Sequence, residues 1–285
     1  MKIYCSYPRA QYLAHKKDID AAVNRVLESE VSSFENEFSS WLGIDYCVGV
    51  NSGTDALFLA LRAFDIGQGD EVIAPSFTAV PTIAAIGMTG ASPVFVDVDP
   101  EFYTLDPTKV EAAITTKTRA IITVHLYGQS AELEQLQQIA RENNLKLIED
   151  CAQAHGGKIG ESMLGTLGDV GCFSFFPTKN LGALGDGGAI VTNDEALAMK
   201  CRMIANHGRL SKYEHEFEGR NSRLDGMQAA ILTVKLKYLD KWTDHRIDIA
   251  SSYVKHLSEI KDIVLPSKKQ WARHVFHLFV IRSKK

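Results

Sequence analysis

The sequence predicts an α/β fold in which helices cover both faces of a mostly parallel central sheet. Short apolar, β-prone segments alternate with helical segments from about residue 46 to about residue 192. Parallel strands need crossover connections, which are usually helices, so this alternation indicates a parallel sheet. The chain has 285 residues, 45% of them hydrophobic, which is enough for one large α/β domain and a smaller piece.

Two amphipathic helices are expected before the sheet begins. In the first, apolar residues recur at helical spacing: Ile19, Ala22, Val23, Val26 and Leu27. The second is expected to start at the capping-box pattern Ser32-x-x-Glu35 and to end at Gly43. Its apolar face would hold Phe34, Phe38, Trp41 and Leu42.

Seven segments are then expected to be strands: 46–50, 71–74, 93–97, 120–125, 145–149, 171–176 and 189–192. A turn at 51–54 leads into a helix, another helix follows Asp194, and helical spacing returns at Gln228. The charged, aperiodic segment 209–220 is expected to be a mobile loop. We expect one large domain over residues 1–240 and the start of a smaller domain over residues 241–285.

Composition excludes several classes of partner. The net charge is −4, with acidic and basic residues interspersed, so no nucleic-acid footprint or membrane-surface patch is indicated. No apolar run is long enough to cross a bilayer, and the N-terminus lacks the apolar core of a signal peptide. The five cysteines show no CxxC spacing, which argues against a disulfide framework or a metal site. A cytoplasmic location and buried, reduced cysteines are expected.

Lys179 and Asp150 indicate a specific chemistry when they are taken together. Alone, a lysine before glycines is usually a surface charge, and an aspartate at a strand end is usually a turn or cap residue. Here Asp150 closes one predicted strand and Lys179 follows another. Pyridoxal phosphate (PLP) needs this pair, because a lysine amine forms a Schiff base with its aldehyde and an aspartate keeps its pyridine nitrogen protonated. That pairing should favour the ionised form of Asp150.

Three further positions could contact the same cofactor through its phosphate. Gly53 and Thr54 open a helix directly after a strand, where free N–H groups and the helix dipole attract phosphate. In isolation, an ordinary β-turn with a threonine cap would be the favoured explanation of these two residues, and the predicted PLP lysine elsewhere in the chain makes them phosphate candidates. Ser174, at the end of its strand, could add a second hydroxyl.

The cofactor ring has its own candidate contacts. Phe77 follows the strand 71–74, so it lies near the carboxyl edge of the sheet, where it could stack on the pyridine or simply belong to the core. Gln153 could donate to the phenolic oxygen. His155 could face substrate or be a packed structural histidine. The glycines of 182–188 match neither GxGxxG nor a P-loop, which excludes both of those nucleotide sites.

Five motifs spread over most of the chain resemble the nucleotide-sugar aminotransferases of the DegT/DnrJ/EryC1/StrS family. They are Asn51-Ser-Gly-Thr-Asp-Ala56, Val124-His-Leu-Tyr-Gly-Gln129, Glu149-Asp-Cys-Ala-Gln-Ala-His155-Gly, Phe173-Ser-Phe-Phe-Pro-Thr-Lys-Asn-Leu-Gly-Ala-Leu-Gly-Asp-Gly-Gly188 and Gly219-Arg-Asn-Ser-Arg-Leu-Asp225. The runs that begin at Lys179 and Asn221 look most like members that aminate C3 of dTDP-linked 3-keto-6-deoxyhexoses.

The resemblance implies the aspartate-aminotransferase fold (PLP-dependent transferase fold type I) and a role for each candidate. Lys179 would be the Schiff-base lysine and Asp150 the pyridinium partner. Gly53, Thr54 and Ser174 would hold phosphate, Phe77 would stack on the ring, and Gln153 would contact the phenolic oxygen. The resemblance further implies that Asn221 reaches the phosphate of a neighbouring subunit, which makes the active sites shared in a homodimer.

Substrate is expected to be a nucleotide-linked keto sugar, with L-glutamate as amino donor. His155, Arg223 and His274 are the candidate substrate contacts. Relatives continue past Lys285, so the small domain is expected to be incomplete. Alternatives remain: amination at C4 or of another nucleotide-linked keto sugar, or a catalytically silent PLP-fold binding protein. A dehydratase on this fold would carry histidine in place of Lys179.

Overall fold

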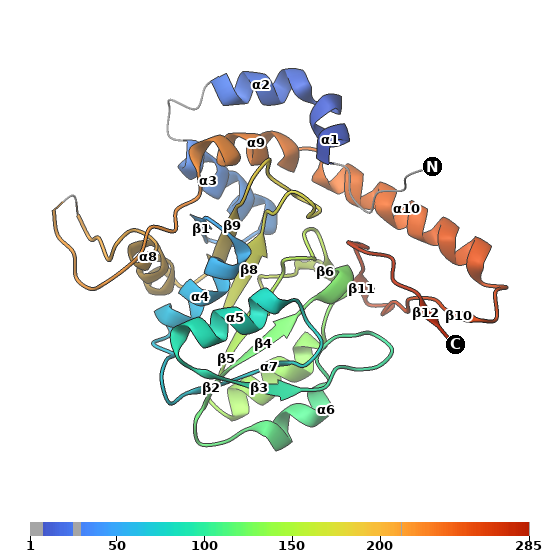
Figure 1. The fold of residues 1–285 in the computed structure, drawn as a ribbon, viewed down its shortest axis with the longest axis horizontal. Coiled ribbons are helices and arrows are strands. Elements are labelled where there is room, and N and C mark those ends of the chain that lie inside the picture. The colour runs from blue at the N-terminus through green and yellow to red at the C-terminus, as the bar shows by residue number, and fades with distance from the viewer. Residues whose placement is uncertain (1–7, 25–29, 212, 285) are drawn as a thin grey trace.

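The computed structural model describes residues 8–24, 30–211 and 213–284 (Figure 1). Its central sheet consists of β1 (Tyr46–Val50), β2 (Glu71–Pro75), β3 (Ser92–Val96), β4 (Thr118–Val124), β5 (Lys146–Asp150), β8 (Val170–Ser174) and β9 (Gly188–Thr192). Two small sheets are made by β6 (Lys158–Ile159), β7 (Ser162–Met163) and β11 (Ala272–Arg273), and by β10 (Ile263–Val264) and β12 (Arg282–Ser283).

The helices surround the central sheet. They are α1 (Pro8–Ala14), α2 (Lys16–Asn24), α3 (Glu30–Leu42), α4 (Gly53–Ala63), α5 (Val80–Thr89), α6 (Pro107–Val110), α7 (Leu133–Glu142), α8 (Glu195–Ile204), α9 (Gly226–Leu236) and α10 (Leu239–Leu257). The described residues also form two short 3₁₀ turns, η1 (Glu111–Ala113) and η2 (Leu126–Gly128). No helix in the described ranges is long and apolar enough to cross a membrane.

The sheet is mostly parallel, as the sequence predicts. Its strand order is β1-β9-β8-β5-β4-β2-β3. The pairs from β8 through β5, β4 and β2 to β3 are parallel, whereas β9 pairs antiparallel with both β8 and β1. Seven predicted strands therefore occupy one sheet, and an antiparallel edge closes it on the β1 side.

Alternating side chains of each strand build two cores, one on each face of the sheet. Ile73, Ile121 and Leu147 pack with residues of α3, α7 and α9 on one face. The intervening Val72 and Ile148 pack with α4, α5 and α8 on the other face. Successive side chains of a strand point to opposite faces, so near-continuous apolar strands are what a sheet covered on both sides requires.

The start of α3 differs from the prediction. The helix begins at Glu30, so Ser32 lies within its first turn and is not the residue that precedes it. Glu35 instead accepts the Gly49 N–H at 2.7 Å and pairs with Arg202 at 2.9 Å, which ties α3 to β1 and α8. Gly43 ends the helix with φ +73°, as expected, and Val26 and Leu27 lie outside the described residues.

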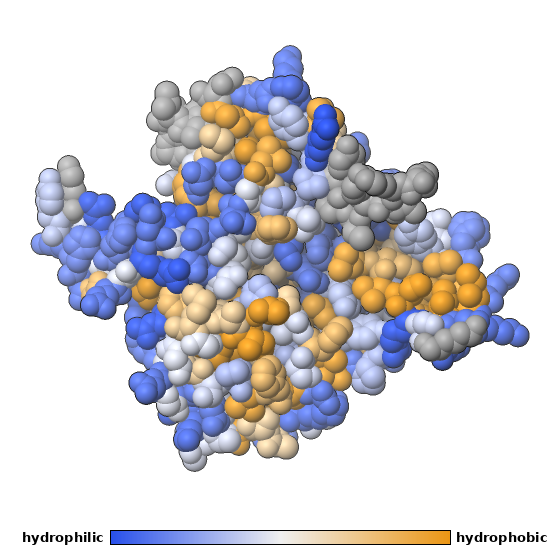
Figure 2. Space-filling view, in the orientation of Figure 1, coloured by the Kyte–Doolittle hydropathy of each residue, from blue (hydrophilic) through white to orange (hydrophobic). Residues whose placement is uncertain are grey.

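The C-terminal part of the chain leaves the sheet along α10 and then returns to it. Helix α10 extends to the right in Figure 1 and leads to β10 and β12. Beyond β11, Val275 N–H donates to Gly128 O at 3.0 Å, which places the 275–278 segment beside η2. Figure 2 shows apolar side chains gathered where α10, β10 and β12 lie in this view. Exposed apolar side chains of the C-terminal part of the chain include Ile249, Tyr253, Val254, Ile260 and Ile281.

Candidate active site

A cavity of about 280 Å³ lies at the carboxyl ends of β4, β5 and β8, beside the start of α4. Open α/β sheets bind ligands at this edge. Six of the predicted site residues line it: Gly53, Thr54, Asp150, Gln153, Ser174 and Lys179. These residues are dispersed along the sequence, and the parallel strand pairing brings them to one edge.

Asp150 is the last residue of β5 and presents a buried carboxylate to the cavity. One oxygen accepts the Thr82 hydroxyl at 2.9 Å, and the other accepts the Ala152 N–H at 3.1 Å. Burial raises the pKa of Asp150, against the opposing effects of these two donors and of the charge on Lys179. Within the described ranges the carboxylate has no ion-pair partner, so a cation placed beside it would relieve the desolvation cost.

Lys179 lies on the irregular segment between β8 and β9 and is partly buried. Its backbone N–H donates to Phe176 O at 2.9 Å, which turns the chain back toward the cavity. Burial lowers the pKa of the Lys179 amine, and the Asp150 carboxylate acts in the opposite direction. A lowered pKa leaves more of the amine in the neutral, nucleophilic form at neutral pH.

The first turn of α4 forms the other end of the cavity. Ser52 caps the helix by accepting the Asp55 N–H at 3.1 Å. The N–H groups of Gly53 and Thr54 precede the first intrahelical bond and have no helix carbonyl to which they can donate. A Cβ on Gly53 would lie 2.5 Å from the Ser174 Cβ, so glycine allows the strand and the helix to meet here.

Gln153 is oriented by a backbone contact. Its Oε1 accepts the Tyr127 N–H at 2.6 Å. Because an N–H must meet an oxygen, this bond fixes the amide orientation and leaves the Nε2 group as a donor at the cavity wall. Tyr127 itself has φ +59°, an uncommon conformation for a residue with a side chain.

Two predicted contacts lie outside the cavity lining. Phe77 is 47% exposed, and its ring stands 6.1 Å from Tyr103 and 6.5 Å from Tyr127, so it belongs to an aromatic group at the rim. The next residue, Thr78, does line the cavity. Asn221 is exposed and pairs through its backbone with Asn206.

The three predicted substrate contacts are not brought together, and none of them lines the cavity. His155 is fully buried between Phe173 and Phe175, and neither ring nitrogen has a hydrogen-bond partner among the described residues. Burial lowers its pKa to about 3, and the charges of Lys179 and His277 act in the same direction.

Arg223 and His274 have other partners. Arg223 donates to Asn206 Oδ1 at 2.6 Å on an exposed surface. His274 is buried, stacks on Phe276 at 3.9 Å and accepts the Phe276 N–H at 3.0 Å.

Of the two histidines in the run His274-Val-Phe-His277, His277 is the one that lies near Lys179. Its Nδ1 lies 3.1 Å from Asn180 Oδ1, and burial lowers its pKa to about 3 with a further lowering from the Lys179 charge. The sequence shows two histidines three residues apart, and only the fold decides which of them approaches the lysine. Ser52 and Thr82 are two more lining residues that the sequence analysis did not single out.

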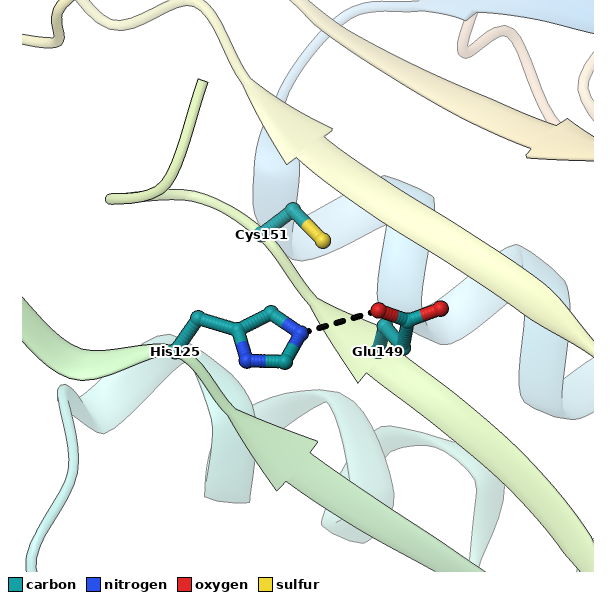
Figure 3. Close-up of side chains that lie close together, drawn as sticks. All are labelled: His125, Glu149 and Cys151. Carbon is teal, nitrogen blue, oxygen red and sulfur yellow. Dashed lines mark hydrogen bonds and ion pairs between the residues drawn. The ribbon is translucent and has the colours of Figure 1, made fainter. Parts of the chain in front are cut away.

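His125, Glu149 and Cys151 form the one grouping of potential metal ligands in the described part of the chain, with their ligand atoms within 4.8 Å of one another (Figure 3). His125 Nδ1 accepts the Ala131 N–H, so its Nε2 donates to Glu149 at 2.9 Å. Glu149 also accepts three backbone N–H groups, from Gly165, Leu167 and Gly168.

These hydrogen bonds occupy both carboxylate oxygens of Glu149. Burial raises the pKa of the Cys151 thiol well above its ordinary value, so the thiolate form that metals prefer is disfavoured. The grouping therefore ties the turn after β4 and the 165–168 segment to β5, just behind Asp150.

The cavity residues fit a phosphorylated pyridine aldehyde at three separate points. The α4 N–H groups suit a phosphate, the unpaired Asp150 carboxylate suits a protonated ring nitrogen, and the Lys179 amine suits an aldehyde. The Gln153 amide can donate to an oxygen on the ring.

Comparison with known proteins agrees with this chemistry. A family model described as the DegT/DnrJ/EryC1/StrS aminotransferase family matches residues 14–285. A dTDP-3-amino-3,6-dideoxy-alpha-D-galactopyranose transaminase of Aneurinibacillus thermoaerophilus is 51% identical over 279 residues, which cover 95% of this chain and 77% of that protein. A dTDP-3-amino-3,4,6-trideoxy-alpha-D-glucose transaminase of Streptomyces venezuelae is 45% identical over 284 residues, covering 97% of this chain and 75% of that protein.

A solved structure shows the same fold. The X-ray structure of S. venezuelae DesV in complex with a ketimine intermediate superposes with a TM-score of 0.96 at 44% identity. The match covers 99% of this chain and 78% of that one. The fold class predicted from the sequence is therefore confirmed, and so is the resemblance on which the functional expectations rest.

Proposed function

This chain belongs to the DegT/DnrJ/EryC1/StrS aminotransferase family, and from that premise we propose that it aminates a dTDP-linked 3-keto-6-deoxyhexose at C3, with PLP as cofactor and L-glutamate as donor. The observation that carries the proposal is the cavity at the sheet edge, where Lys179, Asp150 and the start of α4 are brought together. Relatives with 51% and 45% identity are named as transaminases of dTDP-3-amino sugars.

When bound, PLP supplies an aldehyde that combines with amines and a ring that withdraws electrons from the adjoining carbon. Asp150 keeps the ring nitrogen charged, and the Thr82 and Ala152 donors hold its carboxylate in place. Gly53, Thr54 and Ser174 bind the phosphate, and Gln153 donates to the ring oxygen.

Lys179 acts twice in this proposal. Its amine is the nucleophile that holds the cofactor, and its lowered pKa supports that role. Once the donor has displaced it, the free amine would carry a proton from the donor Cα to the cofactor carbon C4′. In the second half-reaction the same amine would carry a proton from C4′ to C3 of the sugar, so it would be the general acid–base of both halves.

We also propose a homodimer in which Asn221 reaches the neighbouring subunit's phosphate site, and a cofactor domain over residues 1–240 followed by the start of a smaller domain at 241–285. The exposure of Asn221, and its place outside its own chain's cavity, support the shared site.

The test is incubation of the protein with PLP, L-glutamate and each of the two C4 epimers of a dTDP-3-keto-6-deoxyhexose, followed by mass spectrometry and NMR of the products. We expect a 3-amino sugar from at least one epimer, a visible absorption band that shifts on adding glutamate, and neither result with Lys179→Ala. An amino group at C4 of the product would show that the enzyme does not act at C3. A spectrum that responds to glutamate without any sugar product would show that its substrate is not one of these two sugars. Binding of PLP without a spectral response to any amine donor would show instead that the protein binds the cofactor but is catalytically silent.

A further inference from the structure

The segment that carries Lys179 has no helix or strand of its own. It connects β8 to β9, and we call residues 175–187 the lysine loop. Inside it, Phe175 N–H donates to Gly187 O at 2.7 Å and Ala183 N–H donates to Phe175 O at 2.8 Å. Irregular backbone at a buried site needs partners from outside the segment to satisfy its remaining polar groups.

Helix α9 supplies two such partners. Gln228 Oε1 accepts the Leu184 N–H at 2.9 Å, and Lys235 Nζ donates to Gly182 O at 2.6 Å. The two side chains are two helical turns apart and so lie on the same face of α9. One accepts from the lysine loop and the other donates to it, so together they hold the loop at two points.

The lysine loop lies very close to its surroundings at these points. A Cβ on Gly182 would lie 2.5 Å from Pro177 O, and a Cβ on Gly185 would lie 3.2 Å from Gln228 Nε2. Glycine at both positions lets the loop fold on itself and rest against α9. The backbone path of the lysine loop therefore depends on glycine at these two positions and brings the loop into contact with α9.

Lys235 is difficult to explain as a stabilising residue. Its side chain is completely buried, and within the described residues no carboxylate lies within ion-pair distance of it. Burial lowers its pKa to about 8, which is a measure of how unfavourable the charged form is there. A buried lysine without an ion-pair partner destabilises a fold. We therefore look for the role of Lys235 in its hydrogen bond to the Gly182 carbonyl.

We propose that Gln228 and Lys235 are positioning residues that hold the lysine loop and thereby keep Lys179 in place for cofactor capture. This goes beyond the proposed reaction, because it concerns the backbone of the loop and can be measured without any substrate. Neither residue lines the cavity, and their hydrogen bonds reach the loop at Leu184 and Gly182. They act through the loop carbonyl and N–H groups.

The first test is hydrogen–deuterium exchange on the full-length protein, with and without PLP. The variants are Gln228→Met and Lys235→Met, which remove the contacts, and Gln228→Glu, which keeps an acceptor for Leu184. Lys237→Met is the matched control, because Lys237 is an exposed lysine at the end of the same helix. We expect amides of residues 182–187 to exchange about five- to tenfold faster in the first two variants, the factor for one net hydrogen bond, and at the wild-type rate in the other two.

The second test is the rate at which Lys179 captures added PLP, followed by absorbance and confirmed by borohydride reduction and peptide mapping. Capture should slow in Gln228→Met and Lys235→Met and recover in Gln228→Glu. Unchanged exchange and unchanged capture in both Met variants would overturn the inference, as would an equal rise of exchange throughout β4 and β5. That second pattern would mean that the residues only stabilise the fold. Either failure would leave the proposed aminotransferase activity untouched.

Discussion

Asp150 and Lys179 line the same cavity, and burial disfavours the charged form of each. The Asp150 pKa is raised and the Lys179 pKa is lowered, although each residue's charge opposes the shift of the other. The cavity therefore favours a ligand that places a positive charge beside Asp150 and an electrophilic group beside the neutral amine of Lys179.

Asp150→Asn is expected to reduce turnover by at least about a hundredfold, because a neutral amide does not stabilise a protonated ring nitrogen. The variant should still fold and still bind PLP at Lys179, since Thr82 and Ala152 can hydrogen-bond an amide in the same place. Steady-state kinetics and PLP absorbance measure the two effects separately. Turnover at the wild-type level would show that Asp150 is structural.

Lys179 should react with amine-directed reagents at lower pH than an ordinary lysine does in the cofactor-free protein. The sign follows from the cause: burial disfavours the ammonium form, so the neutral amine appears at lower pH. Asp150 raises the pKa of Lys179, so Asp150→Asn should lower the labelling midpoint further while it lowers turnover. Mass-spectrometric labelling across pH measures this midpoint, with exposed Lys237 as the internal reference. A midpoint for Lys179 above that of Lys237 would contradict the prediction.

The junction between β8 and the start of α4 leaves no room for a side chain at position 53. In Gly53→Ala the new methyl group would meet Ser174 at 2.5 Å, so either the helix start or the strand end must move. We expect destabilisation of about 1–3 kcal/mol and weaker PLP binding, because the proposed phosphate contacts at positions 53 and 174 shift.

Gly87 provides the matched control. It lies inside α5, and a Cβ there would meet no atom within 4 Å. Gly87→Ala should therefore stabilise the fold by about 0.5–1 kcal/mol and leave PLP binding unchanged. Thermal unfolding and PLP titration of both variants distinguish close packing at Gly53 from a general effect of glycine replacement.

The strands could be predicted because the sheet is buried on both faces, which makes each strand an apolar run between helices. The positions of Lys179, Asp150 and Gly53 could be predicted for a related reason, since each follows a strand and parallel strands end at one edge. Thr82 and His277 could not, because Thr82 reaches the cavity only through the packing of α5, and His277 reaches Asn180, next to Lys179, only through the return of the chain after α10. His155 could be placed near the site, but its burial between two phenylalanine rings depends on tertiary structure.

Acid should unfold the protein partly through three buried histidines. Burial lowers the pKa values of His155, His274 and His277 to about 3, against an unfolded value of about 6.5. The unfolded chain then binds more protons between those limits, so the stability present above pH ~6.5 is lost as pH falls toward ~3, by about 1.4 kcal/mol per pH unit for each histidine.

His155→Leu tests how much His155 contributes to this dependence of stability on pH. The replacement is apolar, of similar size, and suits a pocket between Phe173 and Phe175. The free energy of unfolding is measured by denaturant titration from pH 4 to 6. As pH is lowered, we expect it to decrease less steeply in the variant than in the wild type, by about 1.4 kcal/mol per pH unit. Identical slopes would show that His155 does not remain neutral in the folded protein.

The proposed homodimer gives Asn221 a role across the subunit interface. Asn221 is exposed, lies outside its own chain's cavity and follows the polar segment 209–220. In a two-fold dimer each subunit can supply the other's phosphate site.

A Lys179→Ala subunit and an Asn221→Ala subunit should each be impaired alone. When mixed under subunit exchange, a shared-site heterodimer has one site with both lesions and one site with neither, so activity should recover to about a quarter of the wild-type value if subunits pair at random in equal amounts. Mixtures no more active than the average of the two parents, or a fully active monomer in sedimentation, would show that each site is built from one chain.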